Sequence, residues 1–255
     1  MSDLVAQDLA IERGGRRVVA DISASLAPGT LTAICGPNGA GKSSLLLALA
    51  GLLPPAQGRV QIANESVATL SPKSRARAIG YLPQGSDIAW DVSVESLVAL
   101  GRHSYGDAAR NSGHEAVAKA LAATHMQDFT HRPASQLSGG EKARALLARV
   151  LAGEPQWILA DEPLAALDLS HQLTLIAHLK ACAAAGQGVV MVLHDLGLAM
   201  NHADRALVLK EGALIADGPP HEALSSRVIE QGWGVASTWL GGPGARALVA
   251  NPENA

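Results

Sequence analysis

A glycine-rich segment between a predicted strand and a predicted helix has the residue types that bind phosphate. Its members are Gly36, Pro37, Asn38, Gly39, Ala40, Gly41, Lys42 and Ser43, a full match to the pattern GxxxxGK[ST]. Glycines allow backbone N–H groups to curve around an anion at a helix N-terminus, where the helix dipole also favours negative charge. Lys42 would place a cation beside the β- and γ-phosphates of a nucleotide, and the Ser43 hydroxyl can bind Mg²⁺. We call Gly36–Ser43 the phosphate loop; a glycine-rich turn without a ligand is the less favoured alternative.

Two adjacent carboxylates, Asp161 and Glu162, follow an apolar run at Trp157–Ala160. The run predicts a buried strand, and ligands bind at the carboxyl ends of strands in parallel α/β sheets. There Asp161 can hold Mg²⁺, directly or through water, and Glu162 is placed to orient or deprotonate an attacking water. An Asp-Glu-Pro triplet alone often only caps the next helix, so this interpretation depends on its pairing with the phosphate loop.

A third segment, Leu137–Glu141, directly precedes an amphipathic helix. The hydroxyl of Ser138 and the backbone N–H groups of Gly139 and Gly140 would form a second anion site at a helix N-terminus. An ordinary helix N-cap explains the same residue types. Taken alone, the segment favours that simpler alternative.

These groups need an α/β core that brings the ends of several strands together. Apolar runs predict strands at Leu4–Ile11, Val18–Leu26, Leu31–Cys35, Gly58–Ala63, Ile79–Leu82, Trp157–Ala160, Val189–Leu193 and Ala206–Leu209. Helices are predicted at Ser43–Gly51, Ser170–Ala184 and Leu196–His202. The first two strands form an antiparallel hairpin, and the later alternation of strand and helix predicts a mostly parallel sheet covered on both faces.

The remaining segments predict the domain organisation. An inserted helical subdomain is expected at about residues 85–150, where Ser112 and Glu115 have the spacing of a capping box. We expect one domain over residues 1–231 and a loosely packed C-terminal tail over residues 232–255, which shows little periodicity. His171 and His178 lie two helical turns apart on one face, so we expect an exposed helix surface and no transition-metal site.

The composition narrows the classes of partner. Lys and Arg number 20 against 23 Asp and Glu, and the net charge of -3 offers no basic surface for nucleic acid. The two cysteines form no CxxC pair and predict no disulfide, which suits a reducing compartment. We expect no secretory signal peptide, and the longest apolar stretches are shorter than the roughly 20 residues that a membrane-spanning helix needs. We therefore expect no segment of this sequence to span a membrane.

The order of these motifs resembles the ATPase domain of ABC transporters over roughly residues 4–225. The matching positions are Gly36–Ser43, Gln84, Leu137–Glu141, Asp161-Glu162, Leu167-Asp168 and His194. The resemblance implies a phosphate-loop (RecA-like) NTPase core with an N-terminal antiparallel β subdomain and a helical insert, and it implies ATP and Mg²⁺ as cofactors. It also implies a homodimer, in which each ATP lies between the phosphate loop of one chain and Ser138–Gly140 of the other.

The resemblance assigns roles to single residues as well. It implies that Gln84 reaches Mg²⁺ and the attacking water and links the site to the helical insert, that His194 contacts the γ-phosphate, and that Asp168 helps to assemble the opposing site. Glu162, His194 and Gln84 are thus the expected catalytic residues, and Ser43, Gln84 and Asp161 the expected metal ligands. A lone Gln is usually solvated and a lone His is usually structural, so these assignments depend on the order of the motifs.

The sequence departs from the family pattern at three places. Arg13 stands where members often place an aromatic residue that stacks on adenine, so base stacking would use its guanidinium plane or the nearby valines. Lys142 and Ala143 stand where two glutamines are common, which would remove a polar contact to the partner's nucleotide. Ser44 stands where threonine is frequent and remains in the expected nucleotide-binding set.

The resemblance extends to a function. It implies the ATP-hydrolysing subunit of a membrane importer at the cytoplasmic face of the inner membrane, working with transmembrane permease subunits and, indirectly, with a periplasmic substrate-binding protein. The segments Val98–Arg102, Asp168–Gln172 and Asp217–Pro220 resemble importers of iron chelates, haem and cobalamin.

The surface that would meet a permease is predicted at Gly85–Arg102, which includes the apolar residues Ile88 and Trp90. Ordinary subdomain core explains these residues equally well. The alternative function is a soluble ABC ATPase that acts as an assembly scaffold without a permease, and membrane association separates the two. A small-molecule kinase is disfavoured by Leu137–Glu141 and His194.

Overall fold

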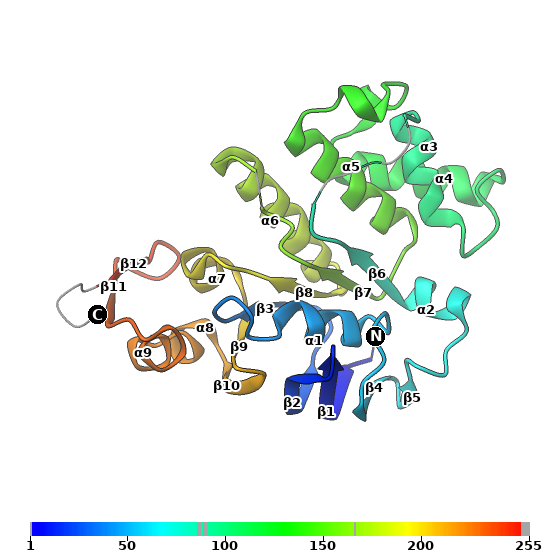
Figure 1. Cartoon of the computed structure of the whole chain (residues 1–255). Helices are drawn as coiled ribbons and strands as arrows, with labels where there is room; N and C mark the ends of the chain where they lie inside the picture. Colours follow the sequence, from blue (N-terminus) through cyan, green and yellow to red (C-terminus); the bar gives the residue numbers. More distant parts are fainter. Residues whose placement is uncertain (1, 86–87, 89–90, 166, 251–255) are drawn as a thin grey trace.

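The computed structural model describes residues 2–85, 88, 91–165 and 167–250 of the chain. Its centre is a six-stranded sheet (Figure 1). In spatial order its strands are β10 (Ala213–Gly218), β9 (Arg205–Lys210), β3 (Leu31–Cys35), β8 (Gly188–Val192), β7 (Trp157–Ala160) and β6 (Ile79–Leu82). The pairs from β9 to β6 are parallel, whereas β10 pairs with β9 antiparallel. The predicted mostly parallel α/β sheet is therefore confirmed.

A second, antiparallel sheet lies below the first in the view of Figure 1. It has the order β2 (Arg16–Leu26), β1 (Leu4–Arg13), β4 (Gln57–Ile62) and β5 (Glu65–Ser66). The turn between β1 and β2 consists of Gly14 and Gly15, whose φ angles are 56° and 75°. Two consecutive positive φ values belong to the tight turn that matches the twist of a hairpin, which is why glycines suit these positions.

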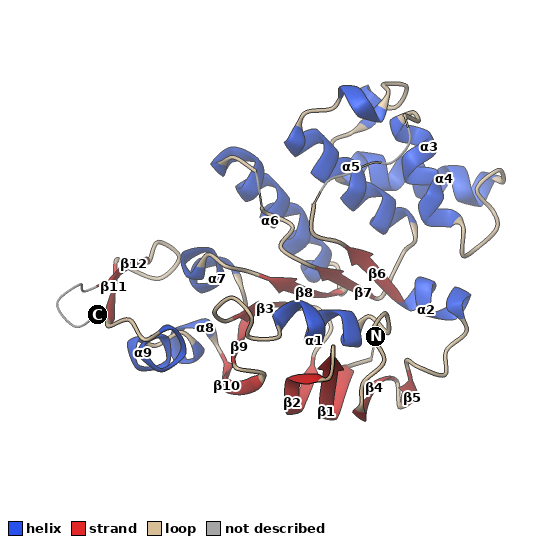
Figure 2. Cartoon of the chain, viewed as in Figure 1, coloured by secondary structure: helices blue, strands red, loops and turns tan. Residues whose placement is uncertain are grey.

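The helices cover both faces of the central sheet (Figure 2). They are α1 (Lys42–Leu49), α2 (Pro72–Ala78), α3 (Val94–Ala99), α4 (Asn111–Ala123), α5 (Gly139–Ala152), α6 (Leu169–Ala184), α7 (Leu196–His202), α8 (Pro220–Ala223) and α9 (Ser226–Trp233). Short 3-10 turns occur at Leu100–Arg102, Gln127–Phe129 and Ala134–Gln136. Among the described residues, no helix combines the length and the apolar character needed to cross a bilayer.

The central strands divide their side chains between two cores because successive residues of a strand point to opposite faces. Ile34, Leu159 and Val190 join α1 and the antiparallel sheet in one cluster. Ile158 and Met191 pack with α3, α4, α5 and α6 in the other cluster. Burial on both faces explains why these strands read as continuous apolar runs in the sequence.

The helices α3, α4 and α5 lie together at the top of Figure 1, beyond the β6 edge of the sheet. Their shared core includes Val94, Leu97, Val117, Leu121 and Leu147, which are all buried. We call these helices and their connections the helical insert. Its expected boundaries at about residues 85–150, and the division of the chain at residue 231, stay predictions.

The predicted capping box at Ser112 and Glu115 is wrong. The N-cap of α4 is Arg110, and it makes no side-chain capping bond. The Ser112 hydroxyl instead donates to Asp107 Oδ2, at 3.0 Å. Ser112 therefore bonds to Asp107, outside the helix, and not to Glu115, the local partner that the spacing suggested.

The segment expected to be a loosely packed C-terminal tail contains regular structure in its described residues. The chain forms a hairpin of β11 (Ser237–Leu240) and β12 (Ala247–Ala250). Trp239 packs against the core and donates its Nε1–H to the Leu224 carbonyl, at 2.7 Å. Asn201 on α7 exchanges two hydrogen bonds with the backbone of Arg246, both at 2.8 Å. The hairpin is held by these long-range contacts.

Candidate functional site

The phosphate loop connects β3 to α1 and follows the buried strand directly. Two of its glycines are required by close backbone approaches. A Cβ atom on Gly36, where φ is 150°, would lie 2.3 Å from the Leu209 carbonyl oxygen, and one on Gly41, where φ is 97°, would lie 2.3 Å from the Val18 carbonyl oxygen. No other residue type fits at either position. The curved loop at the start of α1 follows from these two constraints.

Lys42 lies under the loop and is only 5% exposed. Its Nζ donates to the carbonyl oxygens of Gly36, at 2.8 Å, and of Pro37, at 2.9 Å. Burial lowers the pKa of Lys42, while the nearby negative charge of Glu162 acts in the opposite direction. The side chain is thus a cation with two weak, neutral partners, which a phosphate oxygen can replace.

Asp161 lies beside the phosphate loop at the end of β7 and is 5% exposed. It accepts hydrogen bonds from Ser43 Oγ, at 2.9 Å, and from Tyr81 Oη, at 3.4 Å. Burial raises the pKa of Asp161; the hydrogen bond from Ser43 opposes this shift, and the charge of Glu162 adds to it. A desolvated carboxylate next to a hydroxyl is a hard oxygen donor pair, and such donors fit Mg²⁺.

Three further side chains meet at the ends of three neighbouring parallel strands. Gln84 follows β6, Glu162 follows β7 and His194 follows β8. Gln84 Nε2 donates to Glu162 Oε2 at 2.8 Å, and His194 Nε2 lies 2.5 Å from Glu162 Oε1. Because parallel strands end at the same edge, residues about 110 positions apart converge on one carboxylate.

The backbone of Glu162 adopts the left-handed region, with φ at 47°. A non-glycine residue occupies this region only at some cost in free energy, which the surrounding structure must offset. Such positions are concentrated at functional sites. The conformation follows directly after β7 and aims the carboxylate between Gln84 and His194.

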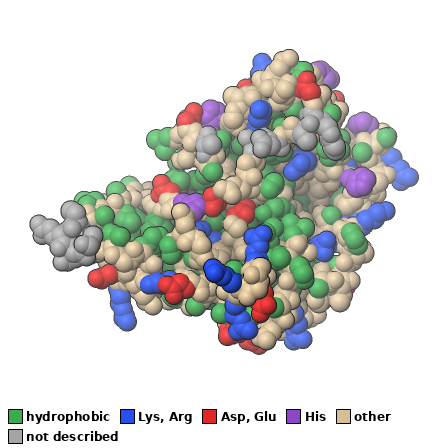
Figure 3. All heavy atoms as spheres, viewed as in Figure 1, with side chains coloured by type: hydrophobic (Ala, Val, Ile, Leu, Met, Phe, Trp, Pro, Cys, Tyr) green, Lys and Arg blue, Asp and Glu red, His purple; other side chains and the backbone are tan. Residues whose placement is uncertain are grey.

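A pocket of about 270 Å³ opens over the phosphate loop. Its lining consists of Arg13, Val18, Asn38, Gly39, Ala40, Gly41, Lys42, Ser43, Ser44, Glu162 and His194. Asp161 and Gln84 adjoin this pocket through their bonds to Ser43 and Glu162. Figure 3 shows acidic side chains and a histidine gathered where the helical insert meets the rest of the molecule. The structure thus brings together the phosphate loop, both carboxylates and the predicted Arg13.

Ser138, Gly139 and Gly140 are not in this lining. Ser138 is the N-cap of α5 and forms a capping box with Glu141: Glu141 N donates to Ser138 Oγ at 3.3 Å, and Ser138 N donates to Glu141 Oε2 at 2.7 Å. The N-cap alternative therefore holds as local structure. Ser138 and Gly139 remain exposed.

Asp168 is likewise an N-cap, at the start of α6. Its Oδ1 accepts from His171 N, at 2.9 Å, and lies 2.7 Å from His171 Nδ1. The side chain is 66% exposed and belongs to no part of the pocket over the phosphate loop. Four of the predicted residues, Ser138, Gly139, Gly140 and Asp168, thus lie away from this pocket.

The sequence reasoning missed Tyr81, which supports Asp161 from β6. Burial raises the pKa of Tyr81 to about 12, and the charge of Asp161 acts in the same direction. Tyr81 pairs with Leu159 across the β6–β7 ladder, so its position next to the last residue of the strand was the available signal.

The expectation that His171 and His178 share an exposed surface is wrong for His178. That side chain is 9% exposed, and its ring centroid lies 5.3 Å from that of His125 at the end of α4. Burial lowers the pKa of His178, with the charge of His125 acting in the same direction. In the described part of the chain, no cluster of three or more His, Cys, Asp or Glu could hold a metal ion.

A curved glycine loop at a helix N-terminus, beside a carboxylate at the end of another parallel strand of the same sheet, defines the α/β phosphate-loop NTPase fold. The family model described as ABC transporter matches residues 19–165. The chain is 40% identical over 238 residues to the hemin import ATP-binding protein HmuV of Rhizobium meliloti (strain 1021), covering 90% of both chains.

Solved structures agree with this match. The fold matches cbiO1 from Clostridium perfringens, described as part of the ABC transporter complex cbiONQ, with a TM-score of 0.78 and 28% identity, over 89% of this chain and 92% of that one. It also matches an ATP-binding cassette in a dimeric post-hydrolysis state bound to ADP and Pi, with a TM-score of 0.75 and 26% identity, over 85% and 98%. The chain therefore belongs to the ABC transporter family, as an ATP-binding ATPase domain, and the resemblance inferred from its motifs is confirmed.

Proposed function

We propose that this chain is the ATPase subunit of a membrane importer for an iron chelate, haem or cobalamin. In this proposal, ATP-driven closure of a homodimer moves a separate permease. The relative from Rhizobium meliloti, named for hemin import, supports haem among these three substrates. A periplasmic substrate-binding protein would deliver the substrate, and the chain would work at the cytoplasmic face of the inner membrane.

The observation that carries the proposal is the position of Glu162 between Gln84 and His194 at the rim of the phosphate loop. Glu162 is the general base for the attacking water, because its carboxylate faces the pocket and is held from both sides. His194 would contact the γ-phosphate, and Gln84 would sense the state of the site from the start of the helical insert. These contacts fix the carboxylate before any substrate arrives, which lowers the cost of positioning it.

The phosphate loop would bind the triphosphate through its backbone N–H groups and Lys42. Arg13 and Val18, which line the pocket, would cover the adenine base. Ser43 and Asp161 would hold Mg²⁺ next to Gln84, and the ion would supply positive charge that offsets the charge on the phosphates. The short Ser43–Asp161 contact and the raised pKa of Asp161 support this donor set.

The homodimer is proposed because the two segments suited to bind phosphate, the phosphate loop and Ser138–Gly140, do not line the same pocket within one chain. Ser138 and Gly139 are exposed at the N-terminus of α5, where backbone N–H groups and the helix dipole favour an anion. A second copy of the chain, turned head to tail, would place this segment over the phosphate loop. The structural relative in a dimeric state bound to ADP and Pi supports that arrangement.

A groove of about 550 Å³ between α2 and the helical insert is the proposed contact with the permease. Its lining includes Lys73, Tyr81, Leu100, His103, Ser104 and Arg149. Leu100 is 46% exposed, and it lies in the predicted segment Gly85–Arg102. Within that segment, Ile88 packs against the core, while Trp90 lies outside the described residues.

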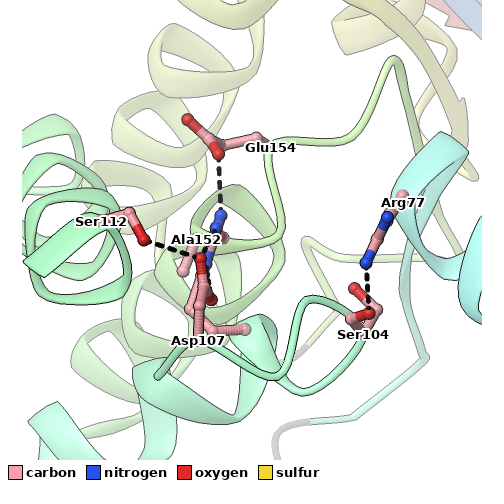
Figure 4. Close-up of polar contacts among 7 residues, drawn as sticks. Arg77, Ser104, Asp107, Ser112, Ala152 and Glu154 are labelled. Carbon is pink, nitrogen blue, oxygen red and sulfur yellow. Dashed lines mark hydrogen bonds and ion pairs between the residues drawn. The ribbon is translucent and has the colours of Figure 1, made fainter. Parts of the chain in front are cut away.

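The wall of this groove is fixed by a polar network (Figure 4). Arg77 on α2 donates to the Ser104 carbonyl at 2.9 Å, which joins the core to the insert. The 3% exposed Arg102 pairs with Asp107 and with Glu154, both at 2.7 Å. A rigid wall that touches both parts of the chain is suited to pass a movement of the insert to a bound partner.

The test is to purify the tagged chain from membranes and to identify the proteins that accompany it. We expect a permease and, in the presence of substrate, a periplasmic binding protein, with ATP hydrolysis by the reconstituted complex stimulated by that loaded binding protein. Haem, an iron chelate and cobalamin are compared as ligands. Recovery only in the soluble fraction, without a permease, would favour the assembly-scaffold alternative.

A variant sharpens this test. Gln84→Ala should reduce transport by the complex more than it reduces ATP binding, because Gln84 contacts Glu162 and precedes the insert. An equal loss of transport and of ATP binding would contradict a coupling role for Gln84.

A further inference from the structure

His171, in the first turn of α6, is held against Asp168 by two hydrogen bonds to one carboxylate oxygen. The backbone N–H of His171 donates to Asp168 Oδ1 at 2.9 Å, and its Nδ1 lies 2.7 Å from the same atom. Because the carboxylate is an acceptor, Nδ1 carries the proton of this bond. The hydrogen bond from the backbone N–H, followed by the one from the side chain, lowers the pKa of Asp168.

The other edge of the same ring lies against the start of α5. A Cβ atom built on Gly140 would lie 1.8 Å from His171 Cδ2 and 2.5 Å from His171 Nε2. The neighbouring Gly139 would meet nothing within 4 Å. Two adjacent glycines therefore have different reasons to be glycine: Gly139 borders open space, whereas Gly140 makes room for the imidazole.

The next residue of α6 holds the loop that precedes it. Gln172 Nε2 donates to the Leu167 carbonyl at 3.1 Å and to the Leu164 carbonyl at 3.4 Å. The loop that carries Asp168 is thus bound to the first turn of α6 through Gln172. His171 extends that connection across to α5.

We propose that His171 is a positioning residue that joins Asp168 to Gly140, so that Asp168 and the segment Ser138–Gly140 meet the partner copy as one rigid surface. This inference rests on the shared nucleotide site of the proposed function. Ser138, Gly139 and Asp168 are exposed in the single chain, so their side chains and backbone would have to be ordered when the dimer forms. A contact that orders them beforehand lowers this cost and tightens the dimer.

The test measures the dissociation constant of the ATP-bound dimer by sedimentation equilibrium in a Glu162→Gln background, where ATP persists. His171→Ala should raise this constant about tenfold, the loss expected from a bond to a charged group that is partly exposed. The affinity of the monomer for ATP should stay within about twofold, because His171 is absent from the pocket over the phosphate loop. His114→Ala, on the exposed surface of α4, is the matched control and should leave both values unchanged.

Two more variants separate the two contacts of the ring. His171→Phe keeps an aromatic ring over Gly140 but has no donor for Asp168, and His171→Asn keeps a donor near the Nδ1 position but has no ring. Each variant should raise the dissociation constant of the dimer by less than His171→Ala does. Thermal unfolding of both variants is measured to show that they fold. If His171→Ala does not fold, the dimer dissociation constants of His171→Phe and His171→Asn are compared with that of the parent instead.

A double-mutant cycle tests the ring contact directly. Gly140→Ala should weaken the dimer strongly when His171 is present and much less when His171 is Ala, because the clash is then gone. Equal losses in both backgrounds, or His171 variants that dimerise like their parent, overturn the proposal while the shared site stands. A Glu162→Gln parent that stays monomeric with ATP overturns both.

Discussion

The phosphate loop and the N-terminus of α5, the two regions proposed to face the phosphates of ATP, differ in how much of each is assembled within one molecule. At the phosphate loop, β3, β6, β7 and β8 place Lys42, Asp161, Gln84, Glu162 and His194 around one pocket with short hydrogen bonds. At the N-terminus of α5, Ser138 is satisfied by its own capping box and Gly139 faces open space. The first region has its chemical groups in place, and the second has only donors.

In the proposed homodimer, this difference would explain how one chain can bind a nucleotide and still depend on a second copy. Groups that do chemistry need fixed geometry, which the converging ends of parallel strands supply. Groups that recognise the closed state need exposure, which a capped helix end supplies without strain. In the proposed homodimer, ATP itself would form the contact between the phosphate loop of one copy and Ser138–Gly140 of the other.

The largest expected effect concerns the assembled region. Glu162→Gln keeps the shape of the side chain and most of its hydrogen bonding but removes the charge that activates water. Hydrolysis should fall by about 10²–10⁴-fold, the usual contribution of general-base catalysis. A phosphate-release assay measures this, and Glu65→Gln on the exposed strand β5 is the control. Hydrolysis at the parent rate would place the base elsewhere.

The next effect concerns Lys42. Lys42→Ala removes the buried cation while the backbone of the loop stays, so the affinity for ATP should fall by about 10–100-fold, as for the loss of a charged hydrogen bond. Lys73→Ala, on exposed α2, controls for the change in net charge. Titration calorimetry measures the ATP affinity of both variants. Unchanged affinity in Lys42→Ala would refute the role of Lys42 in binding phosphate.

A smaller effect on ATP affinity is expected at Arg13, which lines the pocket. If Arg13 covers adenine, Arg13→Tyr should keep or tighten ATP binding, and Arg13→Asp should loosen it by about two- to fivefold. Fluorescent nucleotide displacement at constant ionic strength measures both. Equal affinities for all three proteins would make Arg13 a solvated residue of the turn.

The smallest effect is on stability without ATP or Mg²⁺. The pKa of Asp161 is raised in the folded protein, so its carboxylate favours folding only when protonated, and this contribution is lost as the pH rises through the folded pKa. Asp161→Asn should therefore melt about 2 °C higher than the parent at pH 7.5, with the difference shrinking as the pH falls. A lower melting temperature at pH 7.5 would contradict this account. Adding ATP with Mg²⁺ should stabilise the parent more than the variant.

Much of this molecule could be predicted from single residues and their order. The bounds predicted for the strands Leu31–Cys35, Ile79–Leu82 and Trp157–Ala160 match the structure, because these apolar runs are followed by glycine, proline or a charged residue. The bounds predicted for the helix Leu196–His202 also match, and Asp195 caps its start. Gln84 and His194 were expected at the site with Glu162 from the family resemblance, and strand ends that share one edge explain why the three side chains meet.

What could not be predicted depends on contacts between distant segments. Ser112 turns to Asp107 because Asp107 is already fixed by Arg102, and nothing in the local spacing encodes that pair. The hairpin of β11 and β12 depends on Asn201 and Trp239 meeting distant backbone groups. The left-handed backbone of Glu162 is imposed by its surroundings, since a glutamate has no intrinsic preference for it.

The most direct test of the central claim is the mass of Glu162→Gln by size exclusion with light scattering. With ATP and Mg²⁺ the protein should change from monomer to dimer, and with ADP it should stay a monomer, because only the triphosphate bridges the phosphate loop of one chain and Ser138–Gly140 of the other. The double variant Lys42→Ala/Glu162→Gln should stay monomeric with either nucleotide. A Glu162→Gln protein that remains monomeric with ATP at high protein concentration would contradict the shared site.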